Sequence, residues 1–223
     1  MPTAAVLPAH QERSRESLRK LLDAAIVVLG QYGLDGATIP RIAKQAGLTP
    51  GSVYRRFQDK DALLETAILE ILERQEDTMK TSLAPLATAK VPLEEFAGKI
   101  IRGMVGAYRA NAGLLRGMRQ FMQGRTHTAF GKKASILEAA HFQRTVDLFL
   151  LYGKEITHPN PRMAVSLGLM MVVGTLYHVV VWPREQKKWL RDMLPPDDDA
   201  LAAEVTRAFL SYLGGESRPR PLC

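Results

Sequence analysis

The most concentrated chemistry in the sequence is a short basic stretch between residues 41 and 60. Five basic side chains stand there against a single acid, Asp59: Arg41, Lys44, Arg55, Arg56 and Lys60. Positive charge at this density suits the phosphates that flank the major groove of duplex DNA. The stretch therefore predicts an anionic partner more specifically than does the formal net charge of +7 for the whole chain.

Two short helices joined by a tight turn are predicted to position these side chains. Thr38 offers a side-chain oxygen as the N-cap of a helix that continues to Ala46, and Gly47 ends it. Thr49 caps the next helix, and Pro50 falls at its first position, where a missing N–H does no harm. The free N–H groups at such helix starts can add phosphate contacts.

This spacing is typical of a helix-turn-helix, which needs a small residue where its helices touch and an apolar residue that locks the second helix. Ala43 and Val53 meet these needs, and an amphipathic helix over residues 13–32 supplies more of the core. With Val53 buried, Tyr54 and Arg55 are predicted to point outward or to the rim. Arg56 could instead pair with an acid of the amphipathic helix over residues 13–32.

Helical spacing continues through most of the remaining chain, with no sustained alternation typical of strands. The predicted fold is all-α: an N-terminal three-helix helix-turn-helix domain, residues 1–62, and a C-terminal helical domain, residues 63–223. The tail 1–11 is predicted to be mobile, and residues 83–92 to form a break. Further helices are predicted over residues 60–80, 93–110, 113–123, 128–152, 161–182 and 198–213. Asp59 is predicted to cap the first of these.

The composition is that of an ordinary globular protein of 223 residues, 46% hydrophobic and 24% charged. The single cysteine, Cys223, is the last residue, so a reducing, cytoplasmic compartment fits. The first residues lack the basic start and apolar run of a signal peptide. Common hydrolase, P-loop, dinucleotide and zinc-protease motifs are absent, so no enzyme, catalytic residue, metal or cofactor is predicted.

One uncharged stretch, Met163–Trp182, has about the length needed to span a bilayer. It also contains Ser166, Gly168 and His178, which favour a buried or interfacial helix, so no membrane partner is expected. A membrane-associated helical protein stays an alternative.

The region from Leu21 to Leu64 resembles the DNA-binding region of the tetracycline-repressor (TetR) family. The residues that carry the resemblance are LLDAA at 21–25, Gly33, Thr38, IAKQAGLTPGSVYRRF at 42–57 and the run DKDALL at 59–64. The match covers about the first third of the chain and is specific there. Pro40 departs from it, because the family often has a polar residue near the start of this helix.

The resemblance implies a set of DNA contacts. Thr49 and Ser52 would contact phosphate or base, Gly51 would let the backbone approach DNA, and Tyr54 would hydrogen-bond a phosphate. Lys60 would contact phosphate from the start of the fourth helix, and Arg41 could reach a base or a phosphate. The complete predicted set is Thr38, Arg41, Thr49, Gly51, Ser52, Tyr54, Arg55 and Lys60.

The resemblance also implies that the remaining helices enclose a ligand cavity, with the last two forming a four-helix dimer interface. Aromatic, histidine and methionine side chains of these helices are candidates for an apolar effector pocket, although each residue alone is more typical of helix core. These candidates are Met104, Tyr108, Phe121, Met122, Phe142, Tyr177, His178 and Trp182.

Small residues at helical spacing predict where two copies would meet. Ala164 and Gly168 stand four residues apart on one helix, and such residues let helix backbones approach closely. Val205 and Phe209 repeat at the same spacing on the last helix and would complete the dimer interface.

A second basic stretch, residues 109–133, contains six basic residues and no acid. Two interpretations stay open: a solvated face, or attraction for an anionic effector or for DNA.

The expected function is a ligand-responsive transcriptional regulator in the cytoplasm. As a homodimer it would bind a palindromic double-stranded DNA operator, as a repressor by the family's usual mode, and a small, mostly apolar effector would release it. A non-specific architectural DNA-binding protein is a further alternative.

Overall fold

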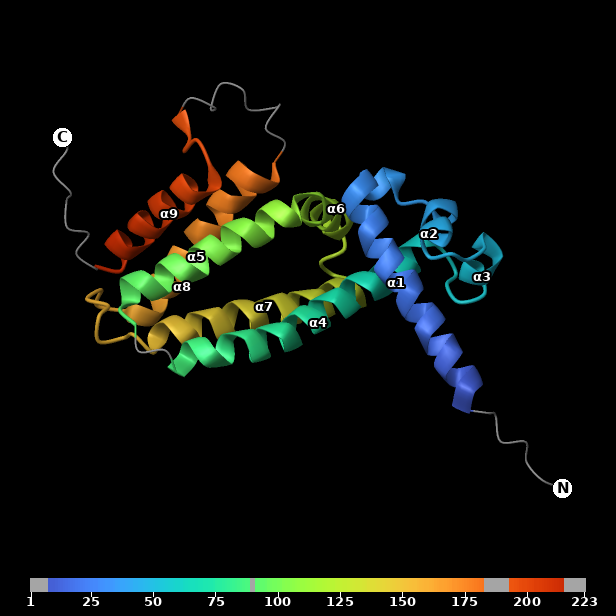
Figure 1. Ribbon diagram of the computed structural model, residues 1–223, viewed down its shortest axis with the longest axis horizontal. Coiled ribbons are helices and arrows are strands. Elements are labelled where there is room, and N and C mark those ends of the chain that lie inside the picture. The colour runs from blue at the N-terminus through green and yellow to red at the C-terminus, as the bar shows by residue number, and fades with distance from the viewer. Residues whose placement is uncertain (1–7, 89–90, 183–192, 215–223) are drawn as a thin grey trace. The chain divides into compact units, whose positions relative to one another are not determined.

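The computed structural model describes residues 8–88, 91–182 and 193–214. Within these ranges the chain forms helices and turns and contains no strand, which confirms the all-α prediction (Figure 1). The elements are α1 Pro8–Gly36, α2 Ile39–Gln45, α3 Pro50–Tyr54, α4 Lys60–Thr88, α5 Leu93–Ala110, α6 Ala112–Met122, α7 Ala129–Leu150, α8 Pro161–Leu176, the π-helical turn η1 Tyr177–Val181 and α9 Asp198–Tyr212.

Two helices are longer than the sequence predicted. Helix α1 begins at Pro8, so the expected mobile tail is wrong for residues 8–11, and residues 1–7 lie outside the described ranges. Proline is favoured at a helix start because its missing N–H would have no partner there. Helix α4 continues to Thr88 through most of the predicted break at 83–92. One proline at position 85 removes a single backbone hydrogen bond, which does not stop so long a helix.

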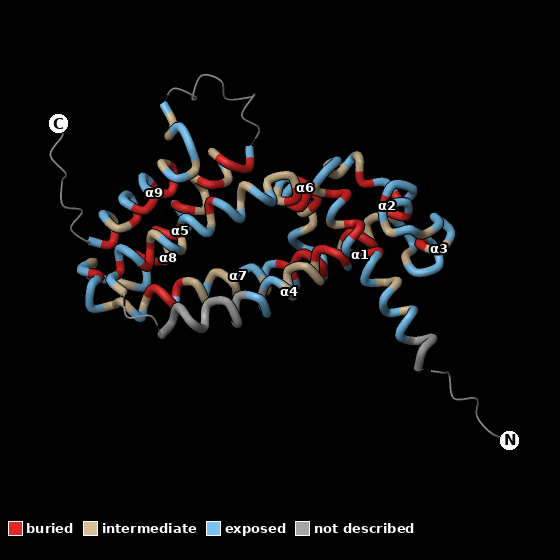
Figure 2. Tube along the Cα trace, viewed as in Figure 1, coloured by how far each residue is buried: buried red, intermediate tan, exposed pale blue. Residues whose placement is uncertain are grey.

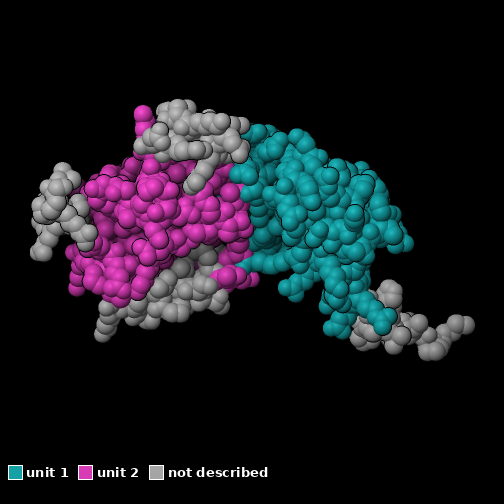
Figure 3. All heavy atoms as spheres, turned by 45° about the horizontal axis from the view of Figure 1, so that its top comes forward, with its two compact units in different colours: residues 1–74, 113–135 teal, residues 75–112, 136–223 magenta. Residues whose placement is uncertain are grey.

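The chain divides into two compact units, coloured separately in Figure 3. The first comprises Met1–Arg74 and Gly113–Ser135, and the second comprises Gln75–Ala112 and Ile136–Cys223. Helix α6 and the beginning of α7 therefore pack with the N-terminal helices. The functional division at residue 62 concerns DNA binding rather than packing, and it stays a prediction.

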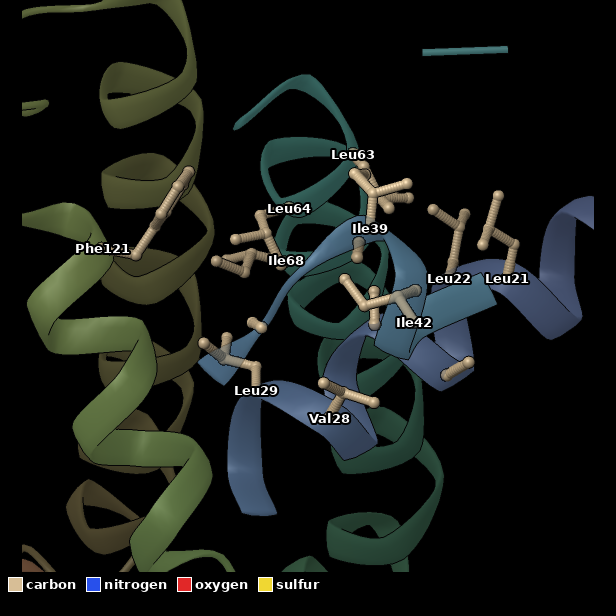
Figure 4. Close-up of a cluster of buried hydrophobic side chains, with 14 of the residues drawn as sticks. Leu21, Leu22, Val28, Leu29, Ile39, Ile42, Leu63, Leu64, Ile68 and Phe121 are labelled. Atoms are coloured by element: carbon tan, nitrogen blue, oxygen red, sulfur yellow. The ribbon is translucent and has the colours of Figure 1, made fainter. Parts of the chain in front are cut away.

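The first unit is built around one apolar cluster from α1, α2, α4 and α6 (Figure 4). Leu29, Ile42, Leu64 and Phe121 are fully buried in it. The periodic apolar face that the sequence shows in α1 is the face that this cluster covers. Burial of such side chains is the main stabilising contribution to the unit, at about 25 cal/mol per Å² of apolar surface removed from water.

A close approach between α1 and α6 adds to the rigidity of the first unit. A Cβ at Gly113 would lie 2.1 Å from the carbonyl oxygen of Gly30, and one at Gly117 would lie 2.8 Å from Leu29 Cδ1. At Gly113 the close atom is backbone, so the two helices can approach this closely only with a glycine there, whereas a Cβ at Gly117 would require the Leu29 side chain to shift.

The second unit has its own core, formed by α5, α8, α9 and the C-terminal part of α7. Phe149 lies at its centre, with ring centroids 5.0 Å from Phe96 and 5.1 Å from Phe209, both in edge-to-face geometry. Figure 2 shows the buried residues of these helices along their facing sides. A Cβ at Gly168 would lie 2.7 Å from the Phe209 ring, so α8 and α9 also meet through a glycine.

One helix among the described residues, Pro161–Val181, is long and apolar enough to cross a membrane, with a mean hydropathy of 2.0. Of its most apolar window, 44% is buried inside the protein. The core helix of a soluble protein passes the same test of length and composition. Ala164, Val165 and Leu169 supply the buried side of this helix, and its other side is exposed.

Candidate functional site

The start of α3 is fixed by a reciprocal capping box. The backbone N–H of Ser52 donates to Thr49 Oγ1 at 3.3 Å, and the N–H of Thr49 donates to Ser52 Oγ at 3.2 Å. The two hydroxyl oxygens lie 2.8 Å apart. This confirms Thr49 as the N-cap and Pro50 at the first helical position. A helix of five residues depends on such local bonds, because it has too few backbone bonds of its own.

The turn between α2 and α3 follows the helix-turn-helix pattern. Gly47 has a φ of 68°, a left-handed conformation that favours glycine, and Leu48 N–H donates to Ala43 O at 2.8 Å. Ala43 and Val53 are both completely buried, as predicted. Phe57 is partly buried against the same core. The buried side of α3 is thereby set, and so is the direction of its remaining side chains.

The caps at the two neighbouring helices differ. Asp59 Oδ1 accepts from Ala62 N–H at 2.8 Å and caps α4, as predicted. Thr38 is the N-cap of α2 by its position and extended backbone, as predicted, but its side chain does not make the expected capping hydrogen bond. Pro40, at the second helical position, has no N–H to donate to this side chain, whereas the N–H of Arg41 at the third position remains.

The predicted contact residues of α3 lie on one open surface. The side chain of Tyr54 is 59% exposed, Arg55, Thr49 and Gly51 are exposed, and Ser52 is half-buried. A Cβ at Gly51 would meet no atom within 4 Å. The chain's own packing therefore does not require a glycine at this position.

Arg41 is exposed on α2, and its guanidinium is held in place from two sides. Its Cζ lies 4.3 Å from the centroid of the Tyr32 ring, and its Nη1 donates to Gly36 O at 2.6 Å. The sequence identified Arg41 as a contact residue but did not reveal Tyr32, because the two residues come from different helices.

Two further cations are anchored to α1. Lys60 Nζ donates to Leu34 O at 3.4 Å, next to the turn that holds Arg41. Arg56 donates to Ser14 O at 3.3 Å and to Ser14 Oγ at 3.4 Å. Arg56 thus bonds to the first helix, as one interpretation proposed, although its partner is a serine rather than an acid. No local signal could have revealed a pair separated by 42 positions.

Three of the six basic residues in the second stretch, residues 109–133, form ion pairs within the two units. Arg125 pairs with Asp61 at 2.6 Å, and Lys133 pairs with Glu73 at 2.8 Å, both within the first unit. In the second unit, the Arg109 guanidinium donates bidentate hydrogen bonds to the carboxylate of Asp198 on α9. These pairs favour a structural role over attraction for an anionic effector or DNA.

The predicted pocket residues fall into separate groups. Phe121 is completely buried in the core of the first unit, and Met122 packs against that core. In the second unit, Met104, Tyr108 and Phe142 are partly buried against the core. The rings of Tyr108 and Tyr177 pack edge to face, with their centroids 5.5 Å apart. His178 and Trp182 are exposed, and their rings are stacked with centroids 6.3 Å apart. The group around Tyr108 is therefore the part of the set with a polar group inside an apolar surrounding.

Tyr108 has an unusual titration because of this surrounding. Burial raises the pKa of its hydroxyl from 10.0 to about 12, and the neighbouring Tyr177 and Glu138 act in the same direction. The shift extends the pH range over which the hydroxyl stays protonated, from about pH 10 to about pH 12. In this form the hydroxyl can donate or accept a hydrogen bond. In the described ranges no group of three His, Cys, Asp or Glu residues could hold a metal ion.

The four residues predicted to form the dimer interface lie inside a single chain. Ala164 and Gly168 are buried on α8, and Val205 and Phe209 are buried on α9. They pack the two helices against each other, with the Phe209 ring over Gly168. Small residues do permit close helix contact here, but the contact is within the chain.

The opposite side of α8 is apolar and exposed. Met163, Leu167, Met170 and Met171 occur there at helical spacing, with exposed fractions from 43% to 61%. Scattered exposed apolar residues are normal, whereas a contiguous row indicates an interaction surface. Asn160, whose side chain accepts from Met163 N–H at 3.0 Å, caps this helix and fixes the start of the row.

Comparison with known proteins identifies the family. Residues 21–67, which include the helix-turn-helix, match the model described as "Bacterial regulatory proteins, tetR family". The HTH-type transcriptional regulator BetI of Escherichia coli is 32% identical over 196 residues, which cover 86% of this chain and 91% of that protein.

Solved structures share the fold over nearly the whole chain. A TetR-family regulator from Mesorhizobium loti has a TM-score of 0.63 at 18% identity and covers 89% of this chain and 97% of its own. FadR from Bacillus subtilis, in complex with stearoyl-CoA, has a TM-score of 0.60 at 18% identity and covers 87% and 98%.

These relatives are DNA-binding transcriptional regulators rather than enzymes. The family match lies over the helix-turn-helix, and the similarity to BetI extends along most of the chain. The protein belongs to the TetR family of bacterial transcriptional regulators.

Proposed function

We propose that the protein is a repressor that binds a palindromic DNA operator as a homodimer and is released by a small, mostly apolar effector in the cytoplasm. Two copies related by a two-fold axis would place their α3 helices in successive major grooves, about 34–36 Å apart. The operator would then mirror the two-fold symmetry of the protein.

The observation that carries this proposal is the surface of α3. Val53 and Phe57 hold the helix against the core, so Tyr54 and Arg55 are directed to solvent together with Thr49. The unfilled space beside Gly51 supports its proposed role, because a close approach of DNA would explain a glycine that the chain's own packing does not need.

The exposed row on α8 supports the homodimer. Isologous dimers bury the same patch on both subunits, and methionine side chains adapt well to such a contact. The proposed contact surface is Met163, Leu167, Met170 and Met171, in place of the four residues buried inside the chain.

The effector is proposed to bind in the second unit near Tyr108, whose hydroxyl would orient a ligand that is otherwise apolar. FadR from Bacillus subtilis binds stearoyl-CoA, which joins a long apolar acyl chain to an anionic CoA group, and the acyl chain supports the apolar part of the proposed ligand. Release from DNA requires that the effector bind the two conformations of the regulator unequally. Helix α4 contributes to both units and is the proposed lever.

The test starts from a duplex recovered by in vitro selection from a randomised library, with a shuffled duplex of equal length as the control. The wild-type protein should prefer the selected duplex by at least about 10³-fold. Similar affinity for both duplexes would favour an architectural binder. Recovery in the membrane fraction at high salt would favour the membrane alternative.

Two variants then locate the contact surface. Tyr54→Phe should weaken binding to the selected duplex about tenfold, since a hydrogen bond to a charged phosphate contributes about 1.5 kcal/mol. Arg55→Ala should lower the slope of log affinity against log salt by about one. Unchanged binding by both variants would remove this surface of α3 from the interface.

A further inference from the structure

The guanidinium of Arg41 is held by two contacts within the protein, although Arg41 is exposed. Its guanidinium stacks on the Tyr32 ring at 4.3 Å, and one nitrogen donates to Gly36 O. The kink at Gly33, with φ 67° and ψ −176°, turns the chain back so that Gly36 lies beside Tyr32. A Cβ at Gly36 would be 2.5 Å from Tyr32 Cβ and 3.2 Å from Arg41 Nη1, so the stack depends on a glycine there.

Arg125, a second arginine of the same unit, is held in a similar way but also has a carboxylate partner, which Arg41 lacks among the described residues. The guanidinium of Arg125 lies 4.1 Å from the Phe121 ring, and its Nη1 donates to Phe121 O at 2.6 Å. Its other terminal nitrogen completes the arrangement by pairing with the carboxylate of Asp61. Arg41 has the ring and the carbonyl, but within residues 8–88, 91–182 and 193–214 no carboxylate pairs with it.

An arginine fixed by a ring and a carbonyl, with the position of the anion left open, is prepared for an anion from outside the chain. Fixing the guanidinium in advance reduces the side-chain entropy that is lost on binding. Arg41 lies on α2, the first helix of the helix-turn-helix. In helix-turn-helix complexes this first helix crosses the DNA backbone. On bound DNA, the anion within reach of Arg41 would therefore be a backbone phosphate.

We propose that Tyr32 is a positioning residue for DNA binding: its ring holds the Arg41 guanidinium toward a backbone phosphate of the operator. This inference rests on the proposed function and extends it to a residue outside the helix-turn-helix. Tyr32 acts through Arg41, and its hydroxyl makes no contact with DNA. The ring is 53% exposed, so its replacement leaves the core of the unit intact.

The experiment compares four proteins with the wild type: Tyr32→Ala, Tyr32→Phe, Arg41→Ala and the double variant Tyr32→Ala/Arg41→Ala. The probe is the selected duplex, titrated over a range of salt concentrations, and thermal unfolding checks that each variant folds. Arg41→Ala should weaken binding and lower the salt slope by about one. Tyr32→Ala should weaken binding about two- to five-fold with the slope unchanged, because the charge remains.

Two comparisons separate positioning from a purely structural role. Tyr32→Phe keeps the ring and should bind like the wild type. The double variant should bind like Arg41→Ala alone, because the ring has no guanidinium left to hold. As a matched control, Tyr32→Ala should weaken binding by the same factor in an Arg55→Ala background as in the wild type.

Three results would overturn the inference. An unchanged salt slope in Arg41→Ala would show that this side chain does not neutralise a phosphate. Equal losses in Tyr32→Phe and Tyr32→Ala would assign the effect to the hydroxyl. Additive losses in the double variant would show that the ring acts independently of Arg41. A wild type that does not distinguish the selected from the shuffled duplex would instead contradict the proposed function itself.

Discussion

The helix pairs α2–α3 and α8–α9 were both interpreted from sequence, and the structure treats the two interpretations differently. In α2–α3, Ala43 and Val53 are buried as predicted, and the residues predicted to face DNA are exposed apart from the half-buried Ser52. In α8–α9, the residues predicted to face a partner are buried within the chain, and the exposed row lies on the other side of α8.

The difference teaches how much a helix pattern specifies about direction. Short α3 contains one buried residue, Val53, so its outward surface follows from a single assignment. Helix α8 is apolar around nearly its whole circumference, and periodicity then cannot distinguish the side facing the core from the side facing a partner. Small residues in α8 indicated a close helix contact but not which helix would make it.

The largest expected effect comes from filling the α8–α9 contact. Gly168→Ala places a methyl group against the Phe209 ring and should lower the free energy of unfolding by about 1–3 kcal/mol, measured by denaturant titration. Gly106→Ala is the matched control, because a Cβ there meets no atom within 4 Å, and it should raise stability by about 0.5–1 kcal/mol. Equal stability of the two variants would contradict the packing of α8 on α9.

The exposed side of α8 should show the reverse behaviour. Met170→Glu should leave the folded subunit intact and raise the dimer dissociation constant by about tenfold or more, since the dimer would bury an unpaired charge. Sedimentation velocity over a range of concentrations measures this. Ile136→Glu is the control, because Ile136 is comparably exposed but lies on α7. A Met170→Glu protein that remains dimeric would place the interface elsewhere.

At α3, loss of the capping box should have a smaller effect. Thr49→Ala removes the acceptor for Ser52 N–H and should lower the unfolding free energy by about 1 kcal/mol. Thr38→Ala should change it much less, because Thr38 makes no side-chain cap. Thermal unfolding of the two variants side by side provides the comparison, and equal losses would contradict the difference between the two caps.

The smallest effect concerns Tyr108 and appears only at high pH. Its pKa is raised to about 12 in the folded protein, so the unfolded state loses this proton first, near pH 10. The stabilisation is fully present below pH 10 and is lost as pH rises toward 12. Tyr108→Phe should therefore lose less stability than the wild type between these values. Parallel losses in urea titrations would show that Tyr108 is not buried as described.

The sequence predicted most of the fold because its signals are local. Caps at Thr49 and Asp59, the turn at Gly47 and the apolar period of α1 each depend on residues a few positions apart. The missed features depend on distant pairs. The Tyr32 ring stacks on Arg41 because the chain kinks at Gly33. Arg125 pairs with Asp61 because the packing of α6 in the first unit brings these distant residues together. Neither contact produces a periodic pattern in the sequence.

The most direct test of the central claim is a hydroxyl-radical footprint of the wild-type protein on its selected duplex. The account predicts two protected patches related by a two-fold axis, with centres about one helical turn or 34–36 Å apart. Tyr54→Phe should weaken both patches together. A single protected patch, or uniform protection along the duplex, would contradict a dimer that places one α3 helix in each of two successive major grooves.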